Sequence, residues 1–436
     1  MSGGWGAAGG PLITTRYLVR LREEFPIWDA GVPGFRSWGT DHPAHLPPPA
    51  PPDTPVSVSG RLHGFSTAAA SLSPGVPWLA RGAGAGYTSW AMDVALFDYE
   101  LPAELIAQEP AEPRDASRLL VLDRGRGTWE DRVFGDLAGL LRPGDCVVAN
   151  RSRVIPARLL GVSEAGGKPV ELLMLRPVGE GRWEALVQPG RRCRVGARVE
   201  LAAGMARARI VGEGAAGARV VEVEGPWPVR ELLERYGLPP LPPYIERHDA
   251  PKPEDRERYQ TVYARDDGSV AAPTAGLHFT PELLARLAGR SVALHYLTLH
   301  VGPGTFRPVR ATRLDEHRME AEPIEIPEAT ARAVHEAKRE GRRVVAVGTT
   351  TTRALEWAMG EAGRLRGGAG EADLFIRPGH RFRVVDALIT NFHLPRSTLL
   401  VLVAALAGRD LILDAYRHAV AARYRFYSYG DAMLIQ

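Results

Sequence analysis

Short runs of alternating apolar and polar residues fill the middle of the chain. Between about 157 and 240 they are PVELLML, RWEALVQP, ARVEL, ARARIVGE and ARVVEVEG, separated by glycine-rich turns. Alternation with a period of two, broken at regular intervals, is typical of the strands of a small antiparallel barrel. We therefore predict a β-barrel domain over 157–240, closed by a helix at RELLERYG.

On both sides of this barrel, strand-like runs alternate with helical patterns. SVALHYLTLHVG, RRVVAVG and RVVDALIT are interpreted as strands, and PEATARAVHEAKREG as a helix that begins at Pro327 and ends at Gly341. Residues 92–156 add two strands, SRLLVLDR and DCVVANRS. The pattern predicts a multidomain α/β fold. Its core, with parallel strands, consists of 92–156 and 241–436 and carries the barrel as an inserted domain.

The first 91 residues differ from the rest of the chain. They contain HLPPPAPPDTP and RGAGAGYTSW and show no sustained periodicity. We expect a flexible extension, or translation from an upstream start, before the organised part that begins at Met92.

Composition narrows the chemistry. The chain has 436 residues, 45% of them hydrophobic, which is enough for more than one core. Its two cysteines lie far apart in the sequence, which excludes a disulfide framework, a cysteine zinc site and a cluster-based radical centre. The lysines, at 168, 252 and 338, stand in loop-like or exposed helical settings, which argues against a Schiff-base lysine. With a net charge of +3, no secretory signal and no membrane-length apolar run, we expect a cytoplasmic protein that does not enter a membrane.

Polar clusters follow several predicted core strands, where ligands bind in α/β sheets. In VGTTTTRALE, Gly348 permits a turn and four threonines begin a helix. One threonine suffices as a cap, so the row favours binding of an anion or a ribose hydroxyl by Thr349 and Thr350. Arg353 is a catalytic candidate that would pair with a carboxylate, for instance that of an amino-acid ligand.

Two further clusters, APTAGLHFT and ITNFHLPRST, share one design. Each places a histidine beside small hydrogen-bonding residues at a strand-to-helix corner. A capped helix with a stray histidine explains either one alone, but the repetition argues for a shared pocket. The substrate-binding candidates are Pro273, Thr274, Gly276 and Asn391, and the catalytic candidates are His278 and His393.

Other motifs leave alternatives open. In LHVGPGTFRPV, Gly302, Gly304 and Thr305 would lie close to a substrate, although an ordinary Gly-Pro turn is the simpler explanation. His300 is as consistent with a core histidine as with a catalytic one.

The C-terminal stretch YRFYSYGDAML sets Tyr427 and Tyr429 beside arginines. This suits base stacking, worth roughly 1–3 kcal/mol per base, or equally a terminal strand that buries alternate aromatic residues. RSRVIPAR and GRRCRVGAR are basic patches that would meet a phosphate backbone or simply face solvent.

Taken in order, FDYELPAELIAQEP, PPYIER, APTAGLHFT, LHVGPGTFRPV, VGTTTTRALE, ITNFHLPRSTLLVLV and YRFYSYGDAML resemble the S-adenosylmethionine:tRNA ribosyltransferase-isomerase family of queuosine biosynthesis. The resemblance runs from about Met92 to Gln436. It implies transfer and isomerisation of the ribosyl moiety of S-adenosylmethionine onto the 7-aminomethyl-7-deazaguanine wobble base of tRNA. The products would be epoxyqueuosine, adenine and methionine.

The resemblance also implies the partners. They are S-adenosylmethionine, as a substrate, and the anticodon loop of tRNA, with no metal and no separate cofactor; we expect a monomer. Because a sulfonium acidifies its neighbouring C5′ protons, one positioned base would start the reaction. We hypothesise that the two histidine clusters line one site, in which His278 and His393 act as acid or base or contact adenine.

Three positions depart from the family pattern. Arg151 stands where the family often has aspartate, Glu320 where a histidine is common, and Thr351 where serine is usual. They keep a second hypothesis open, a family member that binds RNA or a nucleotide with lost or altered activity. A third is an unrelated α/β transferase that uses another nucleoside.

Overall fold

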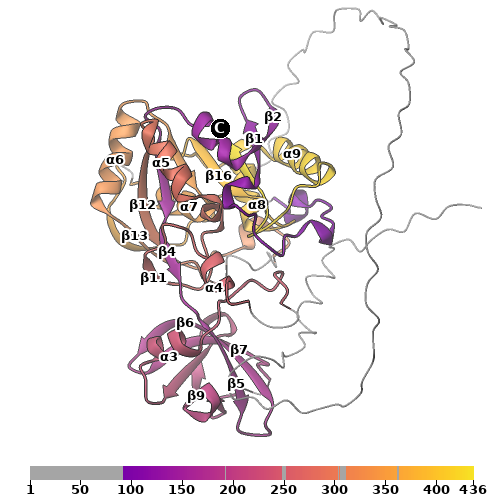
Figure 1. Cartoon of the computed structure of the whole chain (residues 1–436). Coiled ribbons are helices and arrows are strands. Elements are labelled where there is room, and N and C mark those ends of the chain that lie inside the picture. The colour runs from indigo at the N-terminus through magenta and orange to yellow at the C-terminus, as the bar shows by residue number, and fades with distance from the viewer. Residues whose placement is uncertain (1–91, 192, 248–251, 303, 305–310, 361–362) are drawn as a thin grey trace, which may run out of the picture.

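The computed structural model describes residues 92–191, 193–247, 252–302, 304, 311–360 and 363–436. The predicted N-terminal extension, 1–91, lies outside them. The chain forms a large core of sheet and helices with a smaller barrel below it (Figure 1).

The core is built on a nine-stranded mixed sheet in the order β15-β13-β12-β3-β14-β16-β17-β1-β2. Its centre is parallel, as predicted, and consists of β12 (Ala293–Leu299), β3 (Cys146–Asn150), β14 (Val344–Val347) and β16 (Ala387–Asn391). Antiparallel pairs flank this centre, which the sequence did not indicate. One flank holds β13 (Glu322–Ile326) and β15 (Gly368–Ala372), and the other holds β17 (Ala432–Ile435), β1 (Arg118–Asp123) and β2 (Thr128–Val133).

Helices cover both faces of the sheet. Val344 and Ala346 of β14 pack in one layer with α6 (Glu328–Arg339), α7 (Thr349–Ala358), α8 (Thr398–Ala407) and α9 (Arg409–Ala421). Val345 and Val347 pack in the opposite layer with α2 (Leu137–Leu140) and α5 (Pro281–Gly289). Burial on both faces explains why this strand is a continuous apolar run, VVAV. Two helices, α8 and α9, separate β16 from β17 and return the chain to run antiparallel.

The barrel closes with six antiparallel strands in the order β10-β7-β6-β5-β8-β9. They are β5 (Arg158–Ser163), β6 (Pro169–Gly179), β7 (Arg182–Gln188), β8 (Arg198–Leu201), β9 (Ala206–Glu213) and β10 (Arg219–Glu224). Alternate residues such as Trp183, Ala185 and Val187 fill its interior. The helix α3 (Val229–Tyr236) follows, and Leu238 then pairs with Arg158. The predicted fold class, an α/β core with an inserted barrel, is confirmed; β5 is the barrel strand that the sequence pattern did not reveal.

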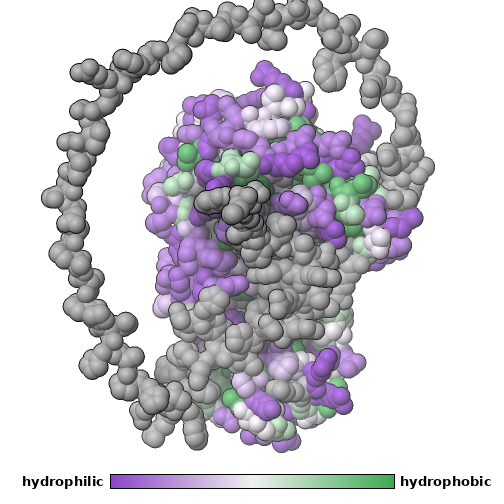
Figure 2. Space-filling view, turned by 90° about the vertical axis from the view of Figure 1, so that its right-hand side faces the viewer, coloured by the Kyte–Doolittle hydropathy of each residue, from purple (hydrophilic) through white to green (hydrophobic). Residues whose placement is uncertain are grey.

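Short elements connect barrel and core. They are the parallel pair β4 (Ser152–Val154) and β11 (Asp266–Ser269), the helix α4 (Asp255–Arg258), and a 3-10 turn at Thr274–His278. Among the described residues, no helix combines the length and apolar character needed to cross a bilayer. Where the face shown in Figure 2 is coloured, polar residues dominate and apolar ones are scattered.

Candidate functional site

A pocket opens at the carboxyl ends of the central parallel strands. Val301 follows β12, residues 348–350 follow β14, and residues 390–395 end and follow β16. Residues 272–275 and 427–428 complete the walls. Counting its open mouth, the pocket has an empty volume of about 750 Å³.

The pocket gathers some of the predicted site residues and excludes others. Those that line it are Pro273, Thr274, Thr349, Thr350, Asn391, His393 and Tyr427. Those that do not line it are Gly276, His278, His300, Gly302, Gly304, Arg353 and Tyr429. Thr305 lies outside the described residues. Both histidine clusters nevertheless meet at this pocket. His393 lines it, and His278 contacts the lining residue Asn391.

Two of the four threonines line the pocket, and the other two donate to backbone carbonyls just before α7. Gly348 has a φ of 92°, a left-handed conformation that favours glycine, and turns the chain from β14 into α7. Thr351 donates a hydrogen bond to the Val347 carbonyl at 2.7 Å and Thr352 to that of Gly348 at 3.1 Å. Thr349 and Thr350 line the pocket, and their hydroxyls bond to no described residue. They are therefore available to a ligand, beside the partially positive start of α7.

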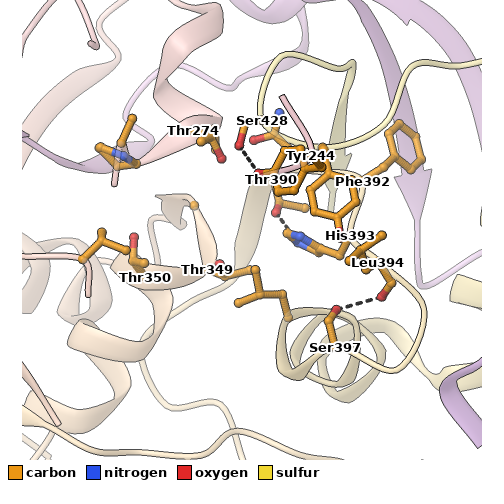
Figure 3. A pocket seen from close by; sticks show the side chains of 18 of the residues that line it. Tyr244, Thr274, Thr349, Thr350, Thr390, Phe392, His393, Leu394, Ser397 and Ser428 are labelled. Carbon is orange, nitrogen blue, oxygen red and sulfur yellow. Dashed lines mark hydrogen bonds between the residues drawn. The ribbon is translucent and has the colours of Figure 1, made fainter. Parts of the chain in front are cut away.

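His393 is held rigidly at the opposite wall (Figure 3). Its Nε2 lies 2.8 Å from Thr390 Oγ1, and its Nδ1 has no partner among the described residues. The backbone amide of His393 donates to the Tyr416 hydroxyl at 3.0 Å, and its carbonyl accepts from the Tyr99 hydroxyl at 2.5 Å. Burial lowers the pKa of His393 from 6.5 to about 3, so the ring is neutral at physiological pH.

Asn391 lines the pocket with His278 directly behind it. Asn391 Nδ2 lies 3.0 Å from His278 Nε2, and His278 Nδ1 lies 2.8 Å from Ser117 Oγ. The imidazole also stacks on Phe134, with ring centroids 4.9 Å apart. Burial lowers the pKa of His278 to about 4, which keeps it neutral as well.

An aromatic wall completes the pocket. The rings of Tyr244 and Tyr427 lie 4.0 Å apart, and the Tyr244 hydroxyl is 2.5 Å from Ser428 Oγ. Tyr427 has a φ of 74°, a left-handed conformation that costs a non-glycine residue about 1–3 kcal/mol. The turn closes over Gly430, where a Cβ atom would lie 2.5 Å from the Arg425 carbonyl oxygen. The aromatic residues precede β17 rather than standing in it, but Tyr427 and Tyr429 are buried, so that alternative is wrong about the strand and right about burial.

Arg353 is engaged within the protein rather than in the pocket. Its Nη1 lies 2.8 Å from Glu322 Oε2, and the two side chains are only 3% and 6% exposed. The guanidinium also donates to the carbonyls of Leu374 and Ala372, each at 3.3 Å. Glu322 in turn accepts from the Gly302 amide at 3.0 Å, so this ion pair holds the segment that follows β12.

The other predicted residues outside the pocket have local packing partners. His300 Nδ1 lies 3.0 Å from Ser152 Oγ, and burial lowers the pKa of His300. Gly276 lies under Tyr263, where a Cβ atom would come within 2.1 Å of the phenol oxygen, and a Cβ at Gly304 would come within 2.7 Å of Glu320 Oε2. Tyr429 packs edge-on against Tyr259, with ring centroids 6.0 Å apart. Their roles in binding or catalysis stay predictions.

The described residues that line the pocket carry no formal charge at neutral pH. Among its described lining residues there is no aspartate, glutamate, lysine or arginine, and His393 is the one imidazole. No group of three or more His, Cys, Asp or Glu in the described ranges is arranged to hold a metal ion. Charge on a ligand would therefore meet backbone dipoles, hydroxyls and aromatic faces.

Several lining residues were not predicted from the sequence. They are Tyr244, Thr390, Phe392, Leu394, Ser397, Leu399 and Ser428, together with small residues of the turns. Thr390 and Ser428 each stand beside a residue that was predicted, and Tyr244 belongs to the motif PPYIER. Their proximity to recognised motifs was the available signal, but only the fold shows which of these side chains reach the pocket.

Comparison with known proteins assigns a family context to this geometry. Residues 94–435 match a family model described as queuosine biosynthesis protein. An S-adenosylmethionine:tRNA ribosyltransferase-isomerase of Heliobacterium modesticaldum is 53% identical over 345 residues, which are 79% of this chain and 100% of the relative. Its counterpart from Symbiobacterium thermophilum is 54% identical over 344 residues, with the same shares covered. A solved S-adenosylmethionine tRNA ribosyltransferase of Thermotoga maritima is 41% identical, covers 78% of this chain and 100% of its own, and gives a TM-score of 0.44.

Proposed function

Because this chain belongs to the queuosine biosynthesis protein family, we propose that it is an S-adenosylmethionine:tRNA ribosyltransferase-isomerase. The observation that carries the proposal is its identity of 53% and 54% to such enzymes across their whole length. The reaction transfers the ribosyl moiety of S-adenosylmethionine to the aminomethyl group of a 7-deazaguanine in tRNA. The ribosyl group is rearranged to give epoxyqueuosine, and adenine and methionine leave.

The pocket at the strand ends suits this substrate. A sulfonium cation is stabilised by aromatic faces, which Tyr244 and Tyr427 provide. A carboxylate or a ribose hydroxyl is stabilised at a helix N-terminus, which α7 provides with Thr349 and Thr350. We place S-adenosylmethionine between these two walls as a substrate. We propose that the reaction needs no separate cofactor.

His393 is the proposed proton acceptor. Removal of the C5′ proton beside the sulfonium requires a base, and His393 presents an unoccupied Nδ1 on an imidazole clamped by Thr390. Because its pKa is about 3, the ring is not an imidazolium at neutral pH and is poorly suited to protonate departing adenine. At neutral pH the ring is therefore in the form that accepts a proton rather than the form that donates one.

The second substrate is the wobble base in the anticodon loop. A base in a loop is unpaired and can be turned out into a pocket and stacked on aromatic side chains. We further propose that the protein acts as a monomer in the cytoplasm, where sedimentation of the purified protein and cell fractionation would test both points.

The departures from the family pattern lie outside the pocket lining. Arg151 Nε is 2.7 Å from Asp266 Oδ2, and the same oxygen accepts from Thr298 Oγ1 at 2.5 Å. Thr351 donates to the Val347 carbonyl at the end of β14, and Glu320 is not a lining residue. The alternative of a binding protein with lost activity therefore receives no support from altered lining residues.

The proposal is tested by incubating the full chain with S-adenosylmethionine and tRNA that carries 7-aminomethyl-7-deazaguanine. We expect epoxyqueuosine at the wobble position by nucleoside mass spectrometry, with one adenine released per nucleoside formed. The matched control is the same tRNA with guanine at that position. Binding of tRNA without any mass gain would favour the binding-only alternative.

A further inference from the structure

The feature that carries a further inference is a buried chain of three side chains behind the pocket. Ser117, His278 and Asn391 lie in hydrogen-bonding sequence, at 2.8 Å and 3.0 Å. Their exposed fractions are 2%, 4% and 3%, and Asn391 is the one that lines the pocket. Phe134 stacks on the imidazole, and its backbone amide donates to the Ser117 carbonyl at 2.8 Å, which supports the middle of the chain and its Ser117 end.

The orientation of the Asn391 amide sets which hydrogen each group carries. His278 is neutral and therefore has one N–H and one acceptor nitrogen. The amide is assigned with Nδ2 toward His278, and in that orientation Nδ2 donates to Nε2 and Nδ1–H donates to Ser117 Oγ. In this orientation Oδ1 is the acceptor that remains on a side chain lining the pocket. It accepts no hydrogen bond from the described residues.

We propose that His278 is a positioning residue that holds the Asn391 amide so that its oxygen accepts a hydrogen bond from a substrate N–H group. This inference rests on the function proposed above. Two substrate groups have the required chemistry, the exocyclic amine of adenine in S-adenosylmethionine and the aminomethyl group of the tRNA base. Without His278 the amide would rotate freely and present its nitrogen to the substrate about as often as its oxygen.

A double-mutant cycle tests the coupling. N391A is expected to lower kcat/KM by about tenfold to a hundredfold, through loss of one substrate contact. H278A alone is expected to lower it by about tenfold or more. The double variant is expected to match N391A within about twofold, because His278 acts only through Asn391. The KM that rises, for S-adenosylmethionine or for tRNA, identifies which amine is bound.

Further variants separate positioning from packing. H278Q offers a carboxamide oxygen to the Asn391 nitrogen and is expected to recover most of the lost activity, whereas a purely structural histidine predicts no such recovery. If H278A does not fold, judged by circular dichroism and thermal melting, S117A and H278Q take its place in the cycle. His335, exposed on α6, supplies the control, and H335A is expected to be unchanged.

The inference is overturned if the effects of H278A and N391A multiply in the double variant, or if folded N391A retains wild-type kcat/KM. Absence of turnover in the wild-type chain is a different result and counts against the proposed function. In that case the affinity for S-adenosylmethionine is measured by calorimetry for H278A, N391A and the double variant. If N391A lowers the affinity and adding H278A lowers it no further, the positioning role of His278 is still supported.

Discussion

Thr390 Oγ1 lies 2.8 Å from Nε2 of His393, and both residues line the same pocket. The next residue along β16, Asn391, is bonded to the other cluster histidine, His278. Because successive strand residues point to opposite faces, the two histidines hold the end of β16 from its two sides. This explains why the chain twice places a histidine at a strand-to-helix corner: each corner contributes one support to the same strand end.

The role of His393 as base predicts a large loss of turnover on its replacement. H393A and H393Q are expected to lower kcat by about 10²–10⁴-fold, the usual contribution of a positioned base, with smaller changes in KM. The measurement is epoxyqueuosine formation under saturating substrates. H335A is the matched control. Turnover within a few-fold of wild type for both variants would remove His393 from the mechanism.

The position of Thr349 and Thr350 predicts a loss of substrate affinity. The variant T349V/T350V is expected to raise the KM for S-adenosylmethionine about tenfold, because each hydroxyl contributes a net hydrogen bond of about 0.5–1.5 kcal/mol. The KM for tRNA should not change. T352V serves as the control from the same helix, since Thr352 donates to the Gly348 carbonyl. Equal KM values in the two variants would speak against a binding role for the first pair.

The neutral histidines predict acid sensitivity of the fold. The pKa values of His278 and His393 are lowered by burial from 6.5 to about 4 and about 3. The unfolded chain therefore binds protons more readily, and the free energy of unfolding falls as the pH drops from 6.5 toward those values. The slope reaches about 1.4 kcal/mol per pH unit for each histidine.

Urea unfolding at pH 7, 6 and 5 measures this slope. Asp431 raises the pKa of His278, and Arg425 and Arg114 lower it, but burial is the largest cause. H278Q removes one titrating group and is expected to reduce the slope relative to wild type. An unchanged slope in H278Q would show that this histidine is not held neutral.

The ion pair of Arg353 with Glu322 predicts a defect in stability. R353M removes the guanidinium that neutralises the buried Glu322 carboxylate, and we expect a loss of about 3–5 kcal/mol in the free energy of unfolding. R353M/E322Q, which removes both charges, should recover part of that loss. A rise in the KM for S-adenosylmethionine with full stability would instead support the carboxylate-binding role expected from the sequence.

Local periodicity was enough to predict much of the fold. The barrel runs bury the face that their alternation displays, and the strand VVAV is apolar throughout because both of its faces are buried. Two of the flanking strands have no such pattern. β2, TWEDRV, is almost wholly exposed, and β15, GAGEA, has little intrinsic strand propensity, so both form because a neighbour offers an edge to pair with.

The candidate site was predictable where residues stand at strand ends. Thr349 and Asn391 converge because the carboxyl ends of parallel strands share one edge. The division of roles depends on tertiary contacts instead. Tyr244 reaches Ser428 across 184 residues of sequence, and Arg353 finds Glu322 through the pairing of distant elements. No local pattern distinguishes His278, which stands behind the pocket, from His393, which lines it.

The central claim is that one pocket, between the start of α7 and the end of β16, holds S-adenosylmethionine. A crystal structure of the protein soaked with S-adenosylmethionine tests it most directly. We predict density for the nucleoside within hydrogen-bonding distance of Thr349, Thr350 and Asn391, with the sulfonium against Tyr427. Density for the bound molecule in any other cleft, with this pocket empty, would contradict the account.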